Sequence, residues 1–255
     1  MKIGVFDSGF GGLSVLSMLR KQYSFDYVYL ADTANCPYGD KNVGQIAHLS
    51  FEAIASLFDL GADFVVIACN TASTILPSIE AHFPANKVLG IIEPTIVGLK
   101  KMSIKSLGVL ATQRTVRSAL YLDKLSPIPV FQQACPTWAS MIERDCIVSE
   151  QIHQDVRQLF QKSPEISHLL LGCTHYPFFN IEQYLPIDVQ VVSQGQFVAD
   201  ALAEVTQSRP QTDAQSTCQF YTTGSPDAFA RRASQLLGYT INCQYLDLTT
   251  EKISP

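Results

Sequence analysis

The chain has 255 residues, of which 47% are hydrophobic and 16% are charged, and its net charge is −5. This length allows one large domain or two smaller ones, and the apolar content is typical of buried parallel sheets. The negative charge, without a long Lys/Arg run, argues against a nucleic-acid partner. A strand-like segment starts at Lys2 and leaves no room for a signal peptide. No apolar run approaches the ~18 residues of a membrane span, so we expect a soluble, cytoplasmic protein without a membrane partner.

The first part of the chain alternates predicted strands and helices. Apolar runs predict buried strands at residues 2–6, 27–30, 64–67 and 88–92. Helices are predicted after the glycine-rich turn 9–14, over 44–60, and over 71–82 with a kink at Pro77. The glycine-rich turn has neither the spacing of a dinucleotide fingerprint nor the lysine of a P-loop. Its backbone N–H groups could still bind an anion.

A second series with the same order follows. Strands are predicted at 106–110, 130–134, 169–171 and 189–192, with helices over about 115–125, over most of 137–162, and after 195. A polar linker at 208–217 leads to a strand at 218–222, a helix and a strand near 241–247.

The fold class is therefore predicted as α/β, with two similar domains that each contain a mainly parallel sheet flanked by helices. We expect residues 1–95 plus 206–255 to form the first domain, which carries Asp7 and Cys69. Residues 96–205 would form the second, which carries Cys173 and His175, and the active site would lie in the cleft between the two.

The cysteines and histidines give no sign of a disulfide framework or a metal site. There are seven cysteines, an odd number, and no Cys-x-x-Cys pair, which argues against disulfide pairing and against a zinc ribbon. Most of the thiols are expected to be small buried side chains in a reducing compartment. The remaining histidines, at positions 48, 82, 153 and 168, lack ligand spacing, so no metal is expected.

Cys69 and Cys173 differ from the other cysteines in their setting. Each follows an apolar strand directly, at the edge where open parallel sheets bind their ligands. Each is also followed by residues that can begin a helix, a setting that favours the reactive thiolate. Two thiols on two matched halves suggest a site in which they face one substrate carbon from opposite sides. The alternative is that both are buried structural cysteines.

Three further residues could take part in this chemistry. Asp7 ends the first strand and could orient a substrate ammonium group or relay a proton, or it could simply cap the next helix. His175 lies two residues after Cys173 and suits proton transfer. Glu143 lies on a predicted helix, where a solvated position is the default interpretation.

Six motifs together resemble the glutamate racemase family, within the cofactor-independent aspartate/glutamate racemases. The resemblance covers residues 3 to about 235. The motifs, in order, are Asp7-Ser8-Gly9-x-Gly11-Gly12, Asp32-Thr33, Pro37-Tyr38-Gly39, Ala68-Cys69-Asn70-Thr71-Ala72, Ile92-Glu93-Pro94 and Leu171-Gly172-Cys173-Thr174-His175-Tyr176-Pro177.

The resemblance implies a homodimeric isomerase that racemises glutamate without a cofactor and supplies D-glutamate for peptidoglycan synthesis. It implies that Cys69 and Cys173 are the two acid/base thiols, assisted by Asp7 and His175 respectively. Glu143 resembles a family glutamate near the second thiol. The implied substrate contacts are Asp7, Ser8, Tyr38, Gly39, Asn70, Thr71, Thr112, Thr174 and His175.

Other functions remain open at this point. The chain could racemise aspartate or another amino acid, or it could be a catalytically inactive amino-acid-binding homologue. A pyridoxal-phosphate enzyme would need a Schiff-base lysine, and no strand-end lysine lies near either cysteine. Two positions depart from the family pattern, because Ala31 replaces a usual glycine and Gln194 lies where an acidic residue is usual.

Overall fold

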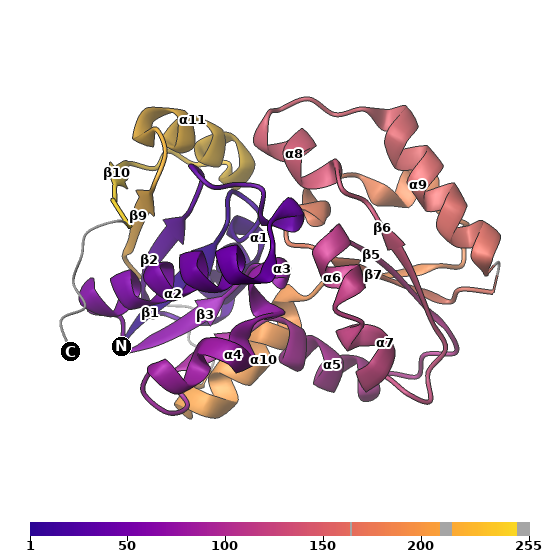
Figure 1. Cartoon of the computed structure of the whole chain (residues 1–255), viewed down its shortest axis with the longest axis horizontal. Coiled ribbons are helices and arrows are strands. Elements are labelled where there is room, and N and C mark those ends of the chain that lie inside the picture. The colour runs from indigo at the N-terminus through magenta and orange to yellow at the C-terminus, as the bar shows by residue number, and fades with distance from the viewer. Residues whose placement is uncertain (164, 210–215, 249–255) are drawn as a thin grey trace.

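The computed structural model describes residues 1–163, 165–209 and 216–248. Within them the chain forms two parallel β-sheets, each flanked by helices, which lie side by side in Figure 1. Most of the linker predicted at 208–217 lies outside the described residues. The predicted α/β class with two parallel sheets is confirmed.

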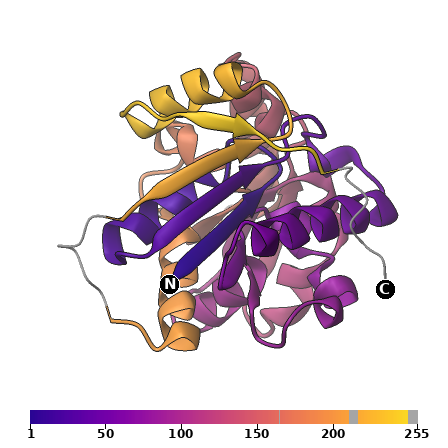
Figure 2. The same cartoon turned by 90° about the vertical axis from the view of Figure 1, so that its left-hand side faces the viewer.

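The first sheet contains the four N-terminal strands and the two C-terminal ones. Its order is β10 (Cys243–Tyr245), β9 (Cys218–Thr222), β2 (Asp26–Ala31), β1 (Lys2–Asp7), β3 (Phe64–Ile67) and β4 (Val88–Gly90). All neighbours pair in parallel, and Figure 2 shows the arrows running in one direction. The C-terminal strands therefore complete the first sheet, as the sequence predicts.

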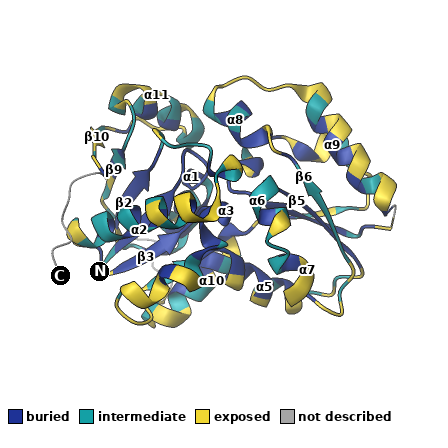
Figure 3. Ribbon diagram, in the orientation of Figure 1, coloured by how far each residue is buried: buried dark blue, intermediate teal, exposed yellow. Residues whose placement is uncertain are grey.

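Alternating side chains give this sheet two apolar faces. Val5 and Tyr29 contribute to a core with α1 (Leu13–Gln22) and α11 (Pro226–Leu237). Phe6 and Leu30, the next residue on each strand, belong to a second core with α2 (Val43–Asp59). Because helices cover both faces, the central strands β1, β2 and β3 are buried along almost their whole length, dark blue in Figure 3, whereas the edge strand β10 is largely exposed. The strand ends are thereby held rigidly at one edge.

The second sheet has the order β6 (Val130–Ala134), β5 (Leu107–Ala111), β7 (His168–Gly172) and β8 (Gln190–Val192), again parallel. One face packs on α8 (Trp138–Glu143) and α9 (Ser149–Lys162) around the buried Trp138. The other face contributes Val109 and Leu170 to the same core that contains Val5. One apolar core is therefore continuous between the two sheets.

Two helices lie at the junction of the sheets. α5 (Ile92–Lys100) and α10 (Gly195–Thr206) pack on each other, and α10 also packs on α1. The domain boundary predicted at 95/96 falls inside α5. No helix in the described part of the chain is long and apolar enough to cross a membrane.

Several predicted elements are divided or displaced. The helix predicted over 71–82 is split into α3 (Asn70–Ser73), α4 (Leu76–Ile79) and a 3₁₀ turn, with Pro77 in the first turn of α4, where its missing N–H is tolerated. The helix predicted near 115–125 is interrupted at Ala119, whose φ is 56°, between α6 (Gln113–Arg117) and α7 (Leu120–Lys124). The strand predicted to reach residue 92 ends at Gly90, and residue 92 is instead the first residue of the helix α5.

Candidate active site

The sheet order brings the predicted site residues to the carboxyl ends of neighbouring strands. β1 and β3 are adjacent, so Asp7, the last residue of β1, and Cys69, just after β3, lie at neighbouring strand ends of the first sheet. β5 and β7 are adjacent, so Thr112 and Cys173 do the same in the second sheet. The edge position predicted for both thiols is confirmed.

Hydrogen bonds join these two edges. The Thr174 hydroxyl donates to Asp7 Oδ2 at 2.9 Å, and the Thr71 and Thr112 hydroxyls lie 2.9 Å apart. The Ser14 hydroxyl donates to the Thr174 carbonyl oxygen at 3.0 Å. The strand ends of the two sheets therefore face each other across one buried polar region.

Cys69 is the N-cap of the short helix α3. Its Sγ accepts the Ala72 N–H at 3.5 Å and lies 3.6 Å from the Ser8 hydroxyl. Burial and, after it, the Asp7 carboxylate raise the pKa of the thiol to about 12, although the hydrogen bonds from Ala72 and Ser8 act in the opposite direction. The helix start favours the thiolate, but burial has the larger effect and favours the neutral thiol. Its surroundings therefore favour the protonated thiol over the thiolate.

Cys173 does not begin a helix, contrary to the sequence prediction. It follows β7 in a bend, and the next element is a 3₁₀ helix, η3, over Tyr176–Phe178. Its polar neighbour is His175, whose Nδ1 lies 3.6 Å from Sγ. The chemical environment of Cys173 is therefore set by an imidazole rather than by a helix end.

His175 connects Cys173 to Glu143. Its Nε2 lies 2.6 Å from Glu143 Oε1, and this oxygen also accepts the Phe10 N–H at 2.8 Å. Burial opposes protonation of the imidazole, but its contacts with Cys173 and Glu143 raise the His175 pKa well above the ordinary value. Glu143 is therefore turned inward toward His175, as the family resemblance implies, rather than outward into solvent.

Asp7 is fully buried, and its carboxylate accepts the Gly9 N–H at 2.8 Å as well as the Thr174 hydroxyl. Burial raises its pKa to about 6, although the charge of His175 and the two hydrogen bonds lower it. Asp7 thus acts on Cys69 through charge, whereas the Ser8 hydroxyl is the direct polar neighbour of Sγ.

The segment Ser8–Gly12, which we call the β1–α1 loop, contacts the partners of both thiols. A Cβ on Gly9 would overlap the Glu143 carboxylate, and a Cβ on Gly11 would overlap His175 Nδ1. These two glycines are therefore required by close approach of the loop backbone to the site.

Among the predicted substrate contacts, Asn70 is the one with an unsatisfied group. Its Nδ2 donates to the Tyr121 hydroxyl at 2.9 Å, while its buried Oδ1 finds no donor within the described part of the chain. Tyr38 instead donates its hydroxyl to Asp32 Oδ2 at 2.6 Å, and Gly39 packs against Thr112. The Tyr38 hydroxyl proton is therefore already engaged by Asp32, which leaves only its oxygen free to accept a hydrogen bond.

Two residues near the site were not proposed from the sequence. The Tyr121 hydroxyl accepts bonds from Asn70 and from Gln194, whose Nε2 lies 2.7 Å away. Cys36 lies beside Glu143 and His175. No local motif could have identified them, because each meets partners that are distant in the sequence.

Comparisons with known proteins identify the family of the chain. Residues 19–202 match the Asp/Glu/Hydantoin racemase family. The glutamate racemase of Ruegeria sp. strain TM1040 is 34% identical over 260 residues, which span 93% of this chain and 97% of that protein.

Solved structures give the same result. The crystal structure of glutamate racemase isoform RacE1 from Bacillus anthracis superposes with a TM-score of 0.85 at 30% identity, covering 96% of this chain and 97% of that one. The crystal structure of glutamate racemase from Francisella tularensis in complex with D-glutamate superposes with a TM-score of 0.83 at 26% identity, and the match covers 98% of each chain. The chain therefore belongs to the Asp/Glu/hydantoin racemase family and, within it, to the glutamate racemases.

Proposed function

We propose that the chain interconverts L- and D-glutamate by moving the α-proton between Cys69 and Cys173. Membership of the family makes it an amino-acid racemase, an isomerase. The observation that carries the two-thiol mechanism is the pair of buried cysteines at facing strand ends, each with its own polar partner. Inversion of a carbon centre requires removal of the proton on one face and donation on the other, which two opposed groups can perform.

The charges around the thiols favour one starting state. A protonated His175, held by Glu143, stabilises negative charge on the adjacent Cys173 Sγ. Burial and the Asp7 carboxylate favour the neutral thiol at Cys69. In this state Cys173 removes the α-proton of one enantiomer and Cys69 donates a proton to the opposite face. The reverse reaction starts once the proton has moved from Cys69 to Cys173.

Proton removal also needs electrostatic help, because an amino-acid α-proton is a weak acid. Neighbouring hydrogen-bond donors, including Thr71 and Thr112, can stabilise the carboxylate as charge develops on it. The unsatisfied Asn70 Oδ1 is an acceptor suited to the substrate ammonium group. Burial of both thiols excludes water, which strengthens each of these interactions.

The test follows L- and D-glutamate separately in D₂O without added cofactor. We expect the wild type to invert both enantiomers and to incorporate deuterium at the α-carbon. Cys69→Ser and Cys173→Ser should each lose racemisation by at least ~100-fold, since each removes one proton-transfer group. Cys146→Ser, which changes an exposed cysteine, is the matched control and should be fully active.

Two outcomes would contradict the proposal. If both active-site variants racemise like Cys146→Ser, the thiols are structural and the mechanism is wrong. If the wild type inverts aspartate but leaves glutamate unchanged, the mechanism stands and the substrate assignment is wrong. Binding of glutamate without α-hydrogen exchange would instead identify an inactive binding homologue.

We also propose that the product D-glutamate serves peptidoglycan synthesis in the cytoplasm and that the enzyme is a homodimer with the two predicted domains. Rescue of a D-glutamate-requiring bacterium by this chain would test the first point. Sedimentation at several protein concentrations would test the second. The division into domains is supported by the strands that form each sheet, since β1–β4, β9 and β10 form one sheet and β5–β8 form the other.

A further inference from the structure

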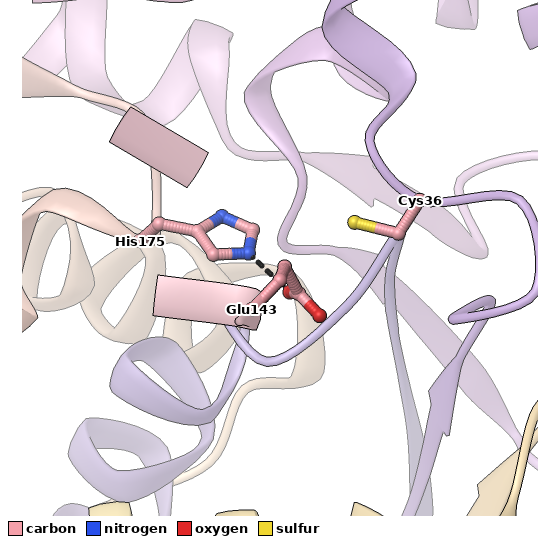
Figure 4. A group of neighbouring side chains, drawn as sticks. All are labelled: Cys36, Glu143 and His175. Atoms are coloured by element: carbon pink, nitrogen blue, oxygen red, sulfur yellow. Dashed lines mark hydrogen bonds and ion pairs between the residues drawn. The ribbon is translucent and has the colours of Figure 1, made fainter. Parts of the chain in front are cut away.

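A cluster of three potential metal ligands lies beside the proposed catalytic groups. Cys36 Sγ, a Glu143 carboxylate oxygen and a His175 ring nitrogen all lie within 4.8 Å of one another, and Figure 4 shows the side chains converging. They come from the loop after β2, the end of α8 and the loop after β7. The fold therefore gathers thiol, carboxylate and imidazole from three distant segments.

We propose that Cys36, Glu143 and His175 form a binding site for a divalent cation of the zinc class, and that the bound ion inhibits racemisation. Zinc combines readily with this mixture of sulfur, nitrogen and oxygen ligands. The binding itself stands on the ligand cluster. The inhibition rests on the proposed function, in which His175 acts on Cys173.

The geometry requires only small movements. Ligand atoms bound to one tetrahedral zinc ion at about 2.0–2.3 Å lie about 3.4–3.6 Å from one another. Nε2 of His175 and Oε1 of Glu143, now 2.6 Å apart, would separate by nearly ~1 Å to admit the ion. The Cys36 thiol would move inward by about 1.2 Å at most, since no two of the three ligand atoms are more than 4.8 Å apart.

The cluster is also accessible. Cys36 and Glu143 line a surface pocket of about 330 Å³, which gives an ion a path to the site and leaves room for a water as fourth ligand. On the other side the backbone of Gly9 lies close, because a Cβ there would overlap Glu143 and lie 3.0 Å from Cys36 Sγ. The site is thus closed by backbone on one side and open on the other.

The surrounding charges include both signs. The buried carboxylate of Asp7 is near enough to interact electrostatically with Cys36 and favours a cation there. Arg144 and Arg232 line the outer pocket, and Arg232 is paired with Asp145 at 2.8 Å. An ion that enters the cluster therefore passes the arginines before it reaches the three ligands.

Binding would change the protons held at the site. The ion displaces the thiol proton of Cys36 and the proton shared by His175 Nε2 and Glu143, and both leave to solvent. His175 is then held by the metal and loses its connection to Glu143. The ion holds the imidazole away from the position in which its Nδ1 lies 3.6 Å from Cys173 Sγ, so racemisation is inhibited.

The direct test is titration of the whole protein with Co²⁺, without substrate, followed by the near-ultraviolet charge-transfer band of a cobalt thiolate. We expect one ion per chain. Cys36→Ser and Cys36→Ala should each lose the band and bind at least ~10-fold more weakly, since even partners behind the ligands change affinity by that much. Cys146→Ser is the control for binding by an exposed thiol and should keep the band.

The inhibition is tested by racemase assays with buffered Zn²⁺. We expect both Cys36 variants to match the wild type in chelator and to resist Zn²⁺ at concentrations that inhibit the wild type. Absence of the cobalt band in the wild type would overturn the proposal, as would a band that persists in both Cys36 variants and disappears in Cys69→Ser. Because the band is read without substrate, it decides the metal site even if glutamate is not turned over.

Discussion

Replacement of Asp7 by asparagine should favour the folded protein, compared with the wild type, more at neutral pH than at acid pH. The buried Asp7 carboxyl has its pKa raised from 3.8 to about 6, so the folded state binds a proton that the unfolded state has lost. Its favourable contribution is complete below pH 3.8 and is lost as the pH rises through about 6. At about 1.4 kcal/mol per pKa unit, full ionisation of Asp7 lowers the free energy of unfolding by about 3 kcal/mol. Asparagine avoids this cost because it has no charge.

The assay is urea unfolding of wild type and Asp7→Asn, followed by circular dichroism at several pH values. The difference between their free energies of unfolding should increase by about 2 kcal/mol in favour of the variant between about pH 4.5 and 7.5. Asp188→Asn, which changes an exposed carboxyl, should show no such trend. A difference between wild type and Asp7→Asn that is independent of pH would refute the assignment of a raised Asp7 pKa.

Three other substitutions test contacts around the site. Gly11→Ala should lower kcat in both directions by about 100-fold, because the new Cβ displaces His175, and a fully active variant would disprove that contact. Thr112→Ala removes the hydroxyl cap of α6 and should lower the free energy of unfolding by ~0.5–2 kcal/mol, which Thr112→Ser should largely restore. Trp138→Phe leaves the Asp155 carboxylate without its 2.8 Å indole donor and should destabilise by ~1–3 kcal/mol in urea unfolding; an unchanged midpoint would contradict it.

The strands were predicted well because their sequence signal is local. Apolar runs at 64–67, 130–134 and 218–222 coincide with β3, β6 and β9. The helices were harder to predict, since their ends depend on backbone details such as the positive φ at Ala119. α5 was missed because Pro94 was expected to end a strand, although proline is tolerated in the first turn of a helix.

The sequence predicted only those site residues that follow a strand or belong to a family motif. Cys69 and Cys173 were identified from their position after apolar strands, while the role of Glu143 came from family resemblance alone. The contact of Tyr121 with Asn70 depends on how α7 packs against α3, which no local pattern reports. The ionisation of the thiols could not be predicted, because a sequence shows a helix start at Cys69 but not the burial whose effect on the pKa is larger.

The β1–α1 loop has a consequence for how such an enzyme can change. Ser8 contacts Cys69, while Phe10 and Gly11 contact Glu143 and His175, which serve Cys173. In the proposed two-thiol mechanism this one segment therefore supports both half-reactions, one through Ser8 and the other through Phe10 and Gly11. The two enantiomers of a substrate have equal free energies in water, so kcat/KM must be equal in the two directions for every variant. A substitution that affects one group alone, such as one at Ser8, can therefore make kcat and KM differ between the two directions but cannot make their ratio differ.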